Sequence, residues 1–509
     1  MQKILHKLEK KSCVQLQFWV VLFATLIAAQ VQYIQHGWIN PDSVLYLEAA
    51  KLFSNGKWEA GFAVFGWPLY SLCIALVNKM TQFGVHVSAQ ILNVLFFTIT
   101  TYSYIKIILL AGGKQKQIIA GALIWLSAQY AIGGVLEMLM RDEGFWAFYL
   151  LSIVFFIRFY QQHQLKDALL WQICIIAATL FRIEAILYVM FLPLILLFQT
   201  GFNAKQKWKH LLMANSINIG LATLLIAVFT FNDQLSTNLL GRLNEIFTIN
   251  IWQQLTQQLT EKSGIMSSQV LGDYLEEFAV QGILMTFIYV IFVKTFSATG
   301  FINVILSAFT IRKNKQLIDL AAFNVLRAAA IIALLNMALI ITKVFVLSSR
   351  YVLALSFILM VFAAFYFADL LSNNNQNKKI KWLSIALVVF MLGGAIKNIL
   401  PKRQGYNYMQ DAVAWIHHNN SEKKSVFYDQ ARMHYYANAP FIGTFDNPLK
   451  YLEKSIVNKS IYNHHYILIE TSKHNQAKNI VHDKLPEYTL IKEFNNAKAK
   501  KGISIYEKN

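Results

Sequence analysis

The chain has 509 residues, of which 56% are hydrophobic and only 14% are charged. Soluble globular domains carry closer to about 25% charged residues, so this composition excludes an ordinary soluble protein and indicates a polytopic membrane protein. The net charge of +19 does not indicate nucleic-acid binding, because the lysines and arginines form short clusters between apolar runs, as in the cytoplasmic loops of membrane proteins.

The N-terminal residues predict a first membrane span that is retained. The segment MQKILHKLEKK leads into an apolar run from about Phe18 without a small-residue cleavage site. This pattern favours a membrane span over a removed signal peptide. Cys13, Cys73 and Cys174 are scattered and form no metal or redox spacing.

Eleven apolar stretches are candidate membrane spans, because a helix needs about 20 apolar residues to cross the hydrocarbon core. They are residues 17–35, 87–110, 117–134, 142–160, 167–181, 184–200, 211–231, 278–298, 319–342, 350–371 and 382–398. If these spans alternate, the basic clusters all fall on one side, which the positive-inside rule assigns to the cytoplasm together with the N-terminus. Residues 299–311 are interpreted as an interfacial helix or as the end of a long eighth helix, since another crossing would separate the basic clusters.

Residues 34–79, between the first two spans, are too polar for a span and too apolar for an ordinary loop. The turn at Asn40-Pro41-Asp42-Ser43 predicts a helix start, and that helix should end near Asn55-Gly56. Residues 68–79 predict a second short helix, and both should lie along the membrane surface. Asp42 would then sit at the membrane–water boundary, either as a helix N-cap or as a functional carboxylate.

The composition changes after about residue 400. Short strands are predicted at 425–428, 466–470, 488–491 and 503–506, with helical runs between them. The sequence therefore predicts a helical membrane domain at 1–400 and a small α/β domain at 401–509, which an odd number of spans places outside. Histidines are frequent in this second region, but they form no recognised metal spacing.

Burying an ionisable residue at membrane depth costs free energy, so each such residue is expected to have a structural or functional role. Glu137 and Arg141 can pair on one helix face, while Asp142 and Glu143 open the fourth span near its positive dipole end. Three further groups are Asp42, Arg182 with Glu184, and Lys343 with Arg350 and Tyr351. Each also has an ordinary structural interpretation: a helix cap, an ion pair and a helix anchor, respectively.

All of these groups fall on the outer face in the expected topology, which favours a common site. A carboxylate there can take a proton from an acceptor hydroxyl, and guanidinium or ammonium groups can bind a phosphate leaving group. A donor whose lipid tail stays in the bilayer would explain why such an enzyme is built from membrane spans. The chain shows no Gly-rich nucleotide loop.

The sequence resembles the GT-C membrane glycosyltransferases, especially the bacterial branch of glycosyltransferase family 39, which is related to protein O-mannosyltransferases and aminoarabinose transferases. The resemblance covers most of residues 15–371, and the C-terminal domain more loosely. The order and placement of several short motifs carry it. These are Pro41-Asp42-Ser43, the Tyr46 to Gly56 helix, Trp67 to Leu72, Arg141-Asp142, Arg182-Ile183-Glu184 and Arg350-Tyr351.

The resemblance implies transfer of a sugar from a polyprenyl-phosphate donor to a glycolipid, glycan or protein acceptor on the outer face of a bacterial inner membrane, usually with inversion. The resemblance implies that Asp42 is the catalytic base and that Asp142 is an acidic residue that assists it. Glu143 is the alternative candidate for the assisting role. The position between the fifth and sixth spans is often Lys or Arg in this family, and Arg182 fits it. Members of this family often have a second acidic residue directly after the first, and here Ser43 stands at that position. No cofactor is therefore expected, although binding of a divalent metal stays an open alternative.

Two other functions remain possible from the sequence. A transporter or flippase of lipid-linked saccharides also needs membrane charges, but transporters usually show internal repeats and broken helices in both halves, and no such repeat is seen. A non-catalytic protein of envelope-glycan assembly, binding partners through its C-terminal domain, is the second alternative. Such a scaffold has no need for both Asp42 and Asp142 beside one cavity.

Overall fold

The computed structural model describes residues 11–35, 37–231, 251–313, 317–372, 378–400, 407–443, 447–472, 476–496 and 500–509. The chain divides into two compact units. We call residues up to Gln32 together with Gln90–Ile399 the helical unit, and Tyr33–Ala89 together with Leu400–Asn509 the mixed unit. The sequence suggested a single boundary near residue 400, whereas the contacts group the first loop with the C-terminal residues.

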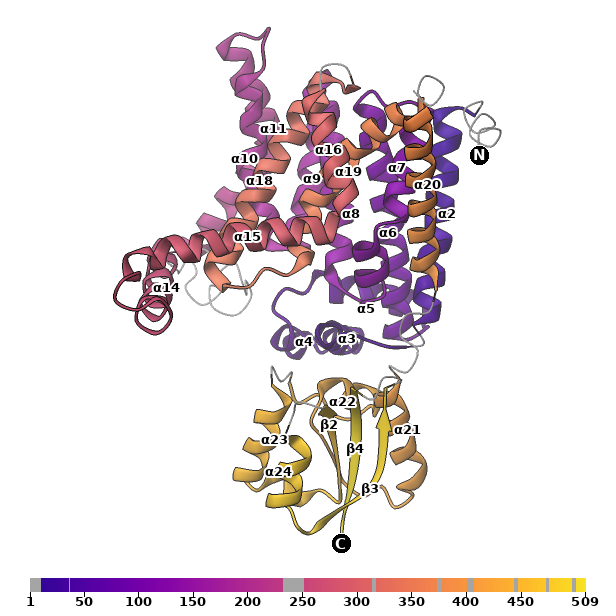
Figure 1. Ribbon diagram of the computed structural model, residues 1–509, viewed down its shortest axis with the longest axis vertical. Coiled ribbons are helices and arrows are strands. Elements are labelled where there is room, and N and C mark those ends of the chain that lie inside the picture. Colours follow the sequence, from indigo (N-terminus) through magenta and orange to yellow (C-terminus); the bar gives the residue numbers. More distant parts are fainter. Residues whose placement is uncertain are drawn as a thin grey trace. The chain divides into compact units, whose positions relative to one another are not determined.

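The helical unit contains the long apolar helices of the chain (Figure 1). Its elements are α2 (Cys13–Ile34), α6 (Val85–Leu110), α7 (Gln115–Leu126), the π-helical turn η1 (Ala131–Val135), α8 (Arg141–Gln162), α9 (Leu165–Phe181), η2 (Ile183–Ala185), α10 (Ile186–Phe191), η3 (Leu192–Phe198), α11 (Ala204–Phe231), α14 (Ile251–Met266), η4 (Ser267–Leu271), η5 (Glu276–Phe278), α15 (Ala279–Thr299), α16 (Phe301–Arg312), α18 (Leu320–Val344), α19 (Ser349–Ser372) and α20 (Lys378–Ile399).

Eight helical segments in the described part of the chain are long and apolar enough to cross a membrane. They are Cys13–Ile34, Val85–Leu110, Gln115–Val135, Arg141–Gln162, Glu276–Thr299, Leu320–Val344, Ser349–Ser372 and Lys378–Ile399. Three other expected spans are not among these eight. Of these, α9 has 17 residues and Ile183–Phe198 alternates 3-10 and α-helical pieces. The third, 211–231, lies in α11, a helix of 28 residues. An all-helical membrane domain is therefore confirmed, while the count of about eleven crossings stays a prediction.

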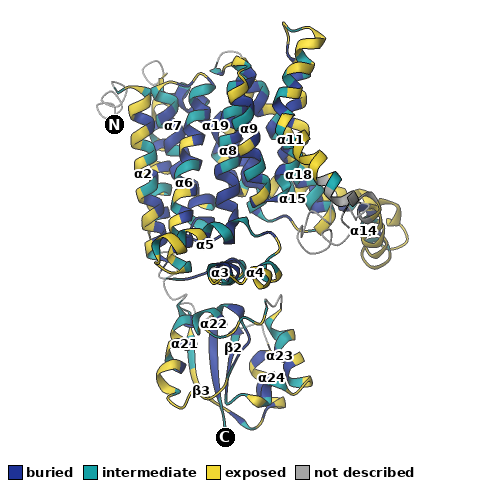
Figure 2. Cartoon of the chain, turned by 180° about the vertical axis from the view of Figure 1, so that it is seen from behind, coloured by how far each residue is buried: buried dark blue, intermediate teal, exposed yellow. Residues whose placement is uncertain are grey.

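The helices α8 and α19 form the centre of the helical unit. In the most apolar 18-residue stretch of each helix, 78% of the residues are buried in α8 and 83% in α19. The corresponding shares are 33% in α2 and 28% in α20 (Figure 2). Large rings fill the space between helices: Trp125 stacks on Phe97 with ring centroids 5.1 Å apart and lies 5.2 Å from Phe357. The exposed apolar faces of the peripheral helices suit contact with lipid.

The chain breaks between α15 and α16 at Gly300, whose φ of 88° is unfavourable for residues with a side chain. In Figure 1, α15 lies across the direction of α18 and α19, and α16 turns to run along α19. The Thr299 hydroxyl donates to Ser356 Oγ at 2.8 Å, and Thr310 donates to the Phe362 carbonyl at 2.6 Å. Residues 301–312 thus form a separate helix packed on α19.

The mixed unit combines the first-loop helices with an α/β domain. Its elements are α3 (Pro41–Ser54), α4 (Trp58–Val64), α5 (Leu69–Thr81), α21 (Tyr408–Asn419), β1 (Val426–Tyr428), α22 (Ala431–Tyr436), α23 (Pro448–Val457), η7 (Ser460–Asn463), β2 (Tyr466–Ser472), α24 (Ala477–Lys484), β3 (Tyr488–Asn495) and β4 (Lys501–Lys508). All four predicted strands are present. The sequence missed α4.

The four strands form one sheet in the order β1-β2-β4-β3, with β1 parallel to β2 and the other pairs antiparallel. Alternate residues of β2 point to opposite faces: Leu468 packs in a core with α21, and Ile467 and Ile469 pack in a core with α23 and α24. Both faces are therefore covered, which confirms the small α/β domain (Figure 1).

Residues far apart in the sequence join the first loop to the α/β domain within the mixed unit. The backbone N–H of Ile39 donates to the Tyr436 hydroxyl at 3.1 Å, and Lys51 Nζ donates to Asn438 Oδ1 at 2.8 Å. These contacts place α3 against α22 and the residues that follow it. They explain why the loop belongs with the C-terminal residues rather than with the spans that flank it.

The packing of α8 on α9 gives a test of the helical unit. A Cβ at Gly144 would lie 2.4 Å from the Phe181 ring, which is fully buried and stacked on Phe148. We expect Gly144→Ala to lower the free energy of unfolding by about 1–3 kcal/mol, because the ring cannot move aside. Thermal unfolding of the purified chain measures this change.

Gly220→Ala is the matched control, because Gly220 also lies in a helix and a Cβ there meets nothing within 4 Å. Its unfolding temperature should stay constant or rise slightly, since alanine is the better helix former. Equal melting temperatures for Gly144→Ala and the wild type would contradict the close packing of α8 on α9.

Candidate functional site

A buried arginine–carboxylate cluster forms where four elements of the helical unit begin or end. We define it as Asp142, Arg182, Glu184 and Arg350. Asp142 lies in the first turn of α8, and Arg182 follows the end of α9 in an extended conformation. Glu184 lies in the 3-10 turn η2, and Arg350 lies in the first turn of α19. Arg182 and Arg350, about 40 and 210 positions further along the chain, thus reach Asp142.

Arg182 is the centre of this cluster. Its guanidinium binds Asp142 through Nη1 and Glu184 through Nη2, the latter at 2.8 Å. Asp142 and Arg182 are only 1% and 4% exposed. The guanidinium also lies 4.4 Å from the centroid of the Tyr351 ring, in a cation–π contact. A buried guanidinium with two carboxylates and an aromatic face is held in one orientation.

Arg350 is the more accessible cation of the cluster. Its Nη1 lies 3.9 Å from the second carboxylate oxygen of Asp142 and 3.1 Å from Met140 Sδ. The side chain is 23% exposed, against 4% for Arg182. Asp142 therefore bridges two arginines, and the outer of them keeps a surface from which it can contact an anion.

Glu143 is buried next to Asp142, with 1% exposure. Neither of its carboxylate oxygens has a hydrogen-bond partner among the described residues. A buried carboxyl group without such a partner costs free energy, so this position is suited to hold a proton or to meet a polar ligand. Arg141, two residues before Glu143, is close enough to Glu184 to interact with it electrostatically.

One sequence expectation beside the cluster is wrong, and another stays untested. Glu137 and Arg141 do not share a helix face, because the π-helical turn ends at Val135, Met140 is extended, and α8 begins at Arg141. The break in the helix lets Met140 contact Arg350. Lys343 lies exposed in the last turn of α18, and its place in the site stays a prediction.

Asp42 lies in the mixed unit, in the first turn of α3. The N-cap is Asn40, and Pro41 occupies the first helical turn, where a missing N–H costs nothing. The alternative interpretation of Asp42 as the N-cap is therefore wrong, since Asp42 lies inside the helix. The cavity expected to be shared by Asp42 and Asp142 stays a prediction, because the two residues belong to different units.

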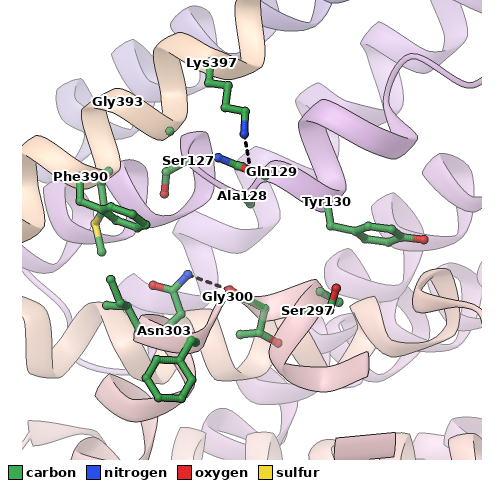
Figure 3. A pocket seen from close by; sticks show the side chains of 16 residues that line it. Ser127, Ala128, Gln129, Tyr130, Ser297, Gly300, Asn303, Phe390, Gly393 and Lys397 are labelled. Atoms are coloured by element: carbon green, nitrogen blue, oxygen red, sulfur yellow. Dashed lines mark hydrogen bonds between the residues drawn. The ribbon is translucent and has the colours of Figure 1, made fainter. Parts of the chain in front are cut away.

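A cavity of about 650 Å³ lies among α7, η1, the α15–α16 junction and α20 (Figure 3). Phe301, Ile302, Phe390 and Met391 supply apolar walls. Polar groups lie among them: Lys397 Nζ donates to Gln129 Oε1 at 3.4 Å, and the Asn303 amide donates to the Thr299 carbonyl. The sequence offered no signal for this cavity, because its lining is brought together only by packing.

Tyr130 connects this cavity with the arginine–carboxylate cluster. Its side chain lines the cavity (Figure 3). Its hydroxyl lies close enough to Ser348, Arg350 and Asp142 to interact with them electrostatically. The cavity and the charged groups therefore adjoin each other within the helical unit.

The sequence also missed a buried acidic pair in the α/β domain. Asp429 directly follows β1, is 2% exposed, and accepts the backbone N–H of Glu470 at 2.8 Å. Glu470 accepts from Gln430 at 2.6 Å and from Lys501 at 3.3 Å. Burial, reinforced by the nearby Glu470 charge, raises the pKa of Asp429 well above its usual range. An acidic residue directly after a strand was the available signal.

Among the residues that the structure describes, no group of three His, Cys, Asp or Glu side chains is arranged to hold a metal ion. The charged groups gathered around Asp142 instead alternate in sign. An anionic ligand such as a phosphate suits the exposed edge of Arg350 better than a cation does.

Comparison with known proteins supports the fold. No protein-family model matches the sequence, and no curated protein matches it. Among solved structures, the oligosaccharyltransferase of Archaeoglobus fulgidus, crystallised with zinc and sulfate, aligns with a TM-score of 0.52 at 13% identity. The alignment covers 95% of this chain and 72% of the archaeal chain. The chain thus has the GT-C type of fold that the sequence motifs suggested.

Asp429 gives a pH-dependent test of the α/β domain. Because its pKa is raised in the folded state, the folded chain holds this proton more tightly than the unfolded chain. This contribution is present below the unfolded pKa of about 3.9 and is lost as the pH rises through the folded pKa. We therefore expect Asp429→Asn to unfold at a higher temperature than the wild type at pH 8, with a difference that shrinks toward pH 4.

Thermal unfolding of the full chain between pH 4 and pH 8 measures this difference, on a scale of about 2–4 °C per kcal/mol. Asp483→Asn is the control, because Asp483 is exposed on α24 and should leave the pH profile unchanged. A variant at Asp429 with the wild-type pH profile would show that the pKa of this carboxyl group is not raised in the folded chain.

Proposed function

We propose that this chain is a membrane glycosyltransferase that moves a sugar from a polyprenyl-phosphate donor to an acceptor hydroxyl. The arginine–carboxylate cluster, in a chain with a GT-C type of fold, is the observation that carries this proposal. The proposed acceptors are glycolipids, glycans or proteins. In the proposed topology the enzyme lies in a bacterial inner membrane, with the N-terminus cytoplasmic and the α/β domain outside.

In this mechanism Arg350 binds the donor phosphate. Its guanidinium is partly exposed and lies 3.9 Å from Asp142, so it can turn its outer edge to a phosphate without losing all contact with the carboxylate. Arg182, Glu184 and Tyr351 position Asp142 and hence Arg350. Arg141, Glu143 and Lys343 are further proposed substrate-binding residues, with Lys343 acting from the exposed end of α18.

Asp42 is the proposed general base. It takes the proton of the acceptor hydroxyl while the acceptor oxygen forms a bond to the anomeric carbon of the donor sugar. The bond between that carbon and the phosphate oxygen breaks, and its electron pair leaves with the polyprenyl phosphate. Attack from the face opposite the phosphate inverts the anomeric centre. Asp142 assists by holding the cations that stabilise the leaving phosphate.

The cavity in Figure 3 supports a lipid-linked substrate. It lies among candidate spans and combines apolar walls with a few polar groups, as ligand cavities usually do. Its contact with the charged cluster through Tyr130 suits a molecule with an apolar chain and an anionic head. We propose that the first isoprenoid units of the donor lie there.

A flippase of lipid-linked saccharides is the second candidate. The break at Gly300, beside the same cavity, favours it, because transporters often bind substrate at interrupted helices. The two functions differ in their products: a transferase releases polyprenyl phosphate, whereas a flippase moves the intact donor across the bilayer.

Asp42→Asn tests the proposed base. The amide keeps the size of the side chain but cannot take a proton, so we expect the transfer rate to fall by about 10²–10⁴-fold in a chain that still folds. Donor consumption in proteoliposomes measures the rate, and thermal unfolding checks the fold. A wild-type rate in this variant would mean that Asp42 is not the base.

Arg350 gives a second test. Lysine keeps the positive charge but not the forked donor geometry, so Arg350→Lys should transfer sugar more slowly than the wild type but faster than Arg350→Ala. The apparent KM for the donor should rise in the same order. Exposed Arg312, at the end of α16, provides the matched Arg→Ala control and should change neither parameter. Equal activity in Arg350→Ala and the wild type would show that Arg350 does not bind the donor phosphate.

A further inference from the structure

A second cavity, of about 530 Å³, lies within the mixed unit, where the first-loop helices meet α22. Both segments contribute polar side chains to its wall. The residues used below are Glu48 and Lys51 of α3, His86 at the start of α6, Tyr435 of α22, and Asn438. These residues are separate from the proposed base and from the arginine–carboxylate cluster.

Contacts across this cavity hold its two sides together. The Tyr435 hydroxyl and His86 Nδ1 lie 3.4 Å apart, and the two rings are tilted by 34° with centroids 6.4 Å apart. Lys51 Nζ donates to Asn438 Oδ1 at 2.8 Å. The other ring nitrogen of His86, Nε2, is buried and has no hydrogen-bond partner among the described residues. The wall is therefore ordered but contains a polar atom whose hydrogen bond is unmet.

The chemistry of the wall favours an uncharged ligand with many hydroxyl groups. Glu48 can accept hydrogen bonds, Lys51 can donate them, and a histidine ring nitrogen can do either depending on its tautomer. One acidic and one basic residue leave no excess charge for a phosphate or a metal cation. Burial raises the pKa of Glu48, an effect that Lys51 partly offsets. The volume lies within the range of about 300–1,000 Å³ usual for small-ligand sites.

We propose that this cavity binds a neutral saccharide unit of a glycan acceptor. The assignment of that saccharide to the acceptor rests on the proposed transferase function. Asp42 and Glu48 lie on the same helix, six residues apart, so their Cα atoms are separated by about 9 Å along the helix axis. At about 100° per residue the side chains of Asp42 and Glu48 leave the helix about 120° apart, so a glycan held at Glu48 and Lys51 has to reach around α3 for a further hydroxyl group to meet the base.

Saturation-transfer NMR on the full chain in lipid nanodiscs tests this site with four probes. They are methyl α-glucoside, methyl α-mannoside, N-acetylglucosamine and chitobiose. We expect at least one probe to bind the wild type. Lys51→Ala and Tyr435→Phe should weaken that binding by roughly 2–10-fold, because each removes hydrogen-bonding groups from the wall.

The matched controls change exposed residues of the same types. Lys79→Ala at the end of α5 and Tyr274→Phe, whose side chain is 96% exposed, should bind the probe as the wild type does. Asp42→Asn should also keep binding, even though it loses transfer. This separates the two proposals: full transfer in Asp42→Asn would contradict only the base. Absence of binding for all four probes, or equal binding in the cavity variants and the wild type, would overturn the saccharide site.

Discussion

The ion pair between Arg182 and Asp142 is the interaction on which the rest of the helical unit depends. Both side chains are almost fully buried, so each needs the other to offset the loss of hydration. Removing one partner of such a pair typically costs about 3–5 kcal/mol, because an uncompensated charge remains. The pair fixes the end of α9 against the start of α8, and through Asp142 it also reaches Arg350 at the start of α19. Three helix ends are thus held at one place, which is what a preorganised site requires.

The sequence predicted the elements better than their contacts. Apolar runs and strand patterns identified the membrane helices and all four strands, because these follow from local periodicity. Asp142, Arg182 and Arg350 were candidates from the sequence, because burying a charge at membrane depth costs free energy and so indicates a role for it. Tyr130 carried no motif, and Asp429 carried only its place directly after a strand, because the importance of both comes from neighbours that only the folded chain brings close. The first loop was placed with the spans for the same reason.

The division into two units separates the proposed chemical tasks. The helical unit holds the cations and a cavity with apolar walls, which suit a phosphate and a lipid chain. The mixed unit holds the proposed base and a polar cavity, which suit a hydroxyl-bearing acceptor, and α3 contributes residues to both. In the proposed inverting transfer, the acceptor hydroxyl attacks the anomeric carbon of the donor from the face opposite the leaving phosphate.

The most direct measurement of the central claim is the fate of a radiolabelled polyprenyl-phosphate sugar in proteoliposomes that contain the purified chain and membrane-extract acceptors. The wild type should move the label to an acceptor and release polyprenyl phosphate. Arg182→Ala should leave the donor intact, because its loss frees Asp142 and Arg350 from their positions. Movement of the intact donor across the bilayer without release of polyprenyl phosphate would contradict a transferase and favour a flippase.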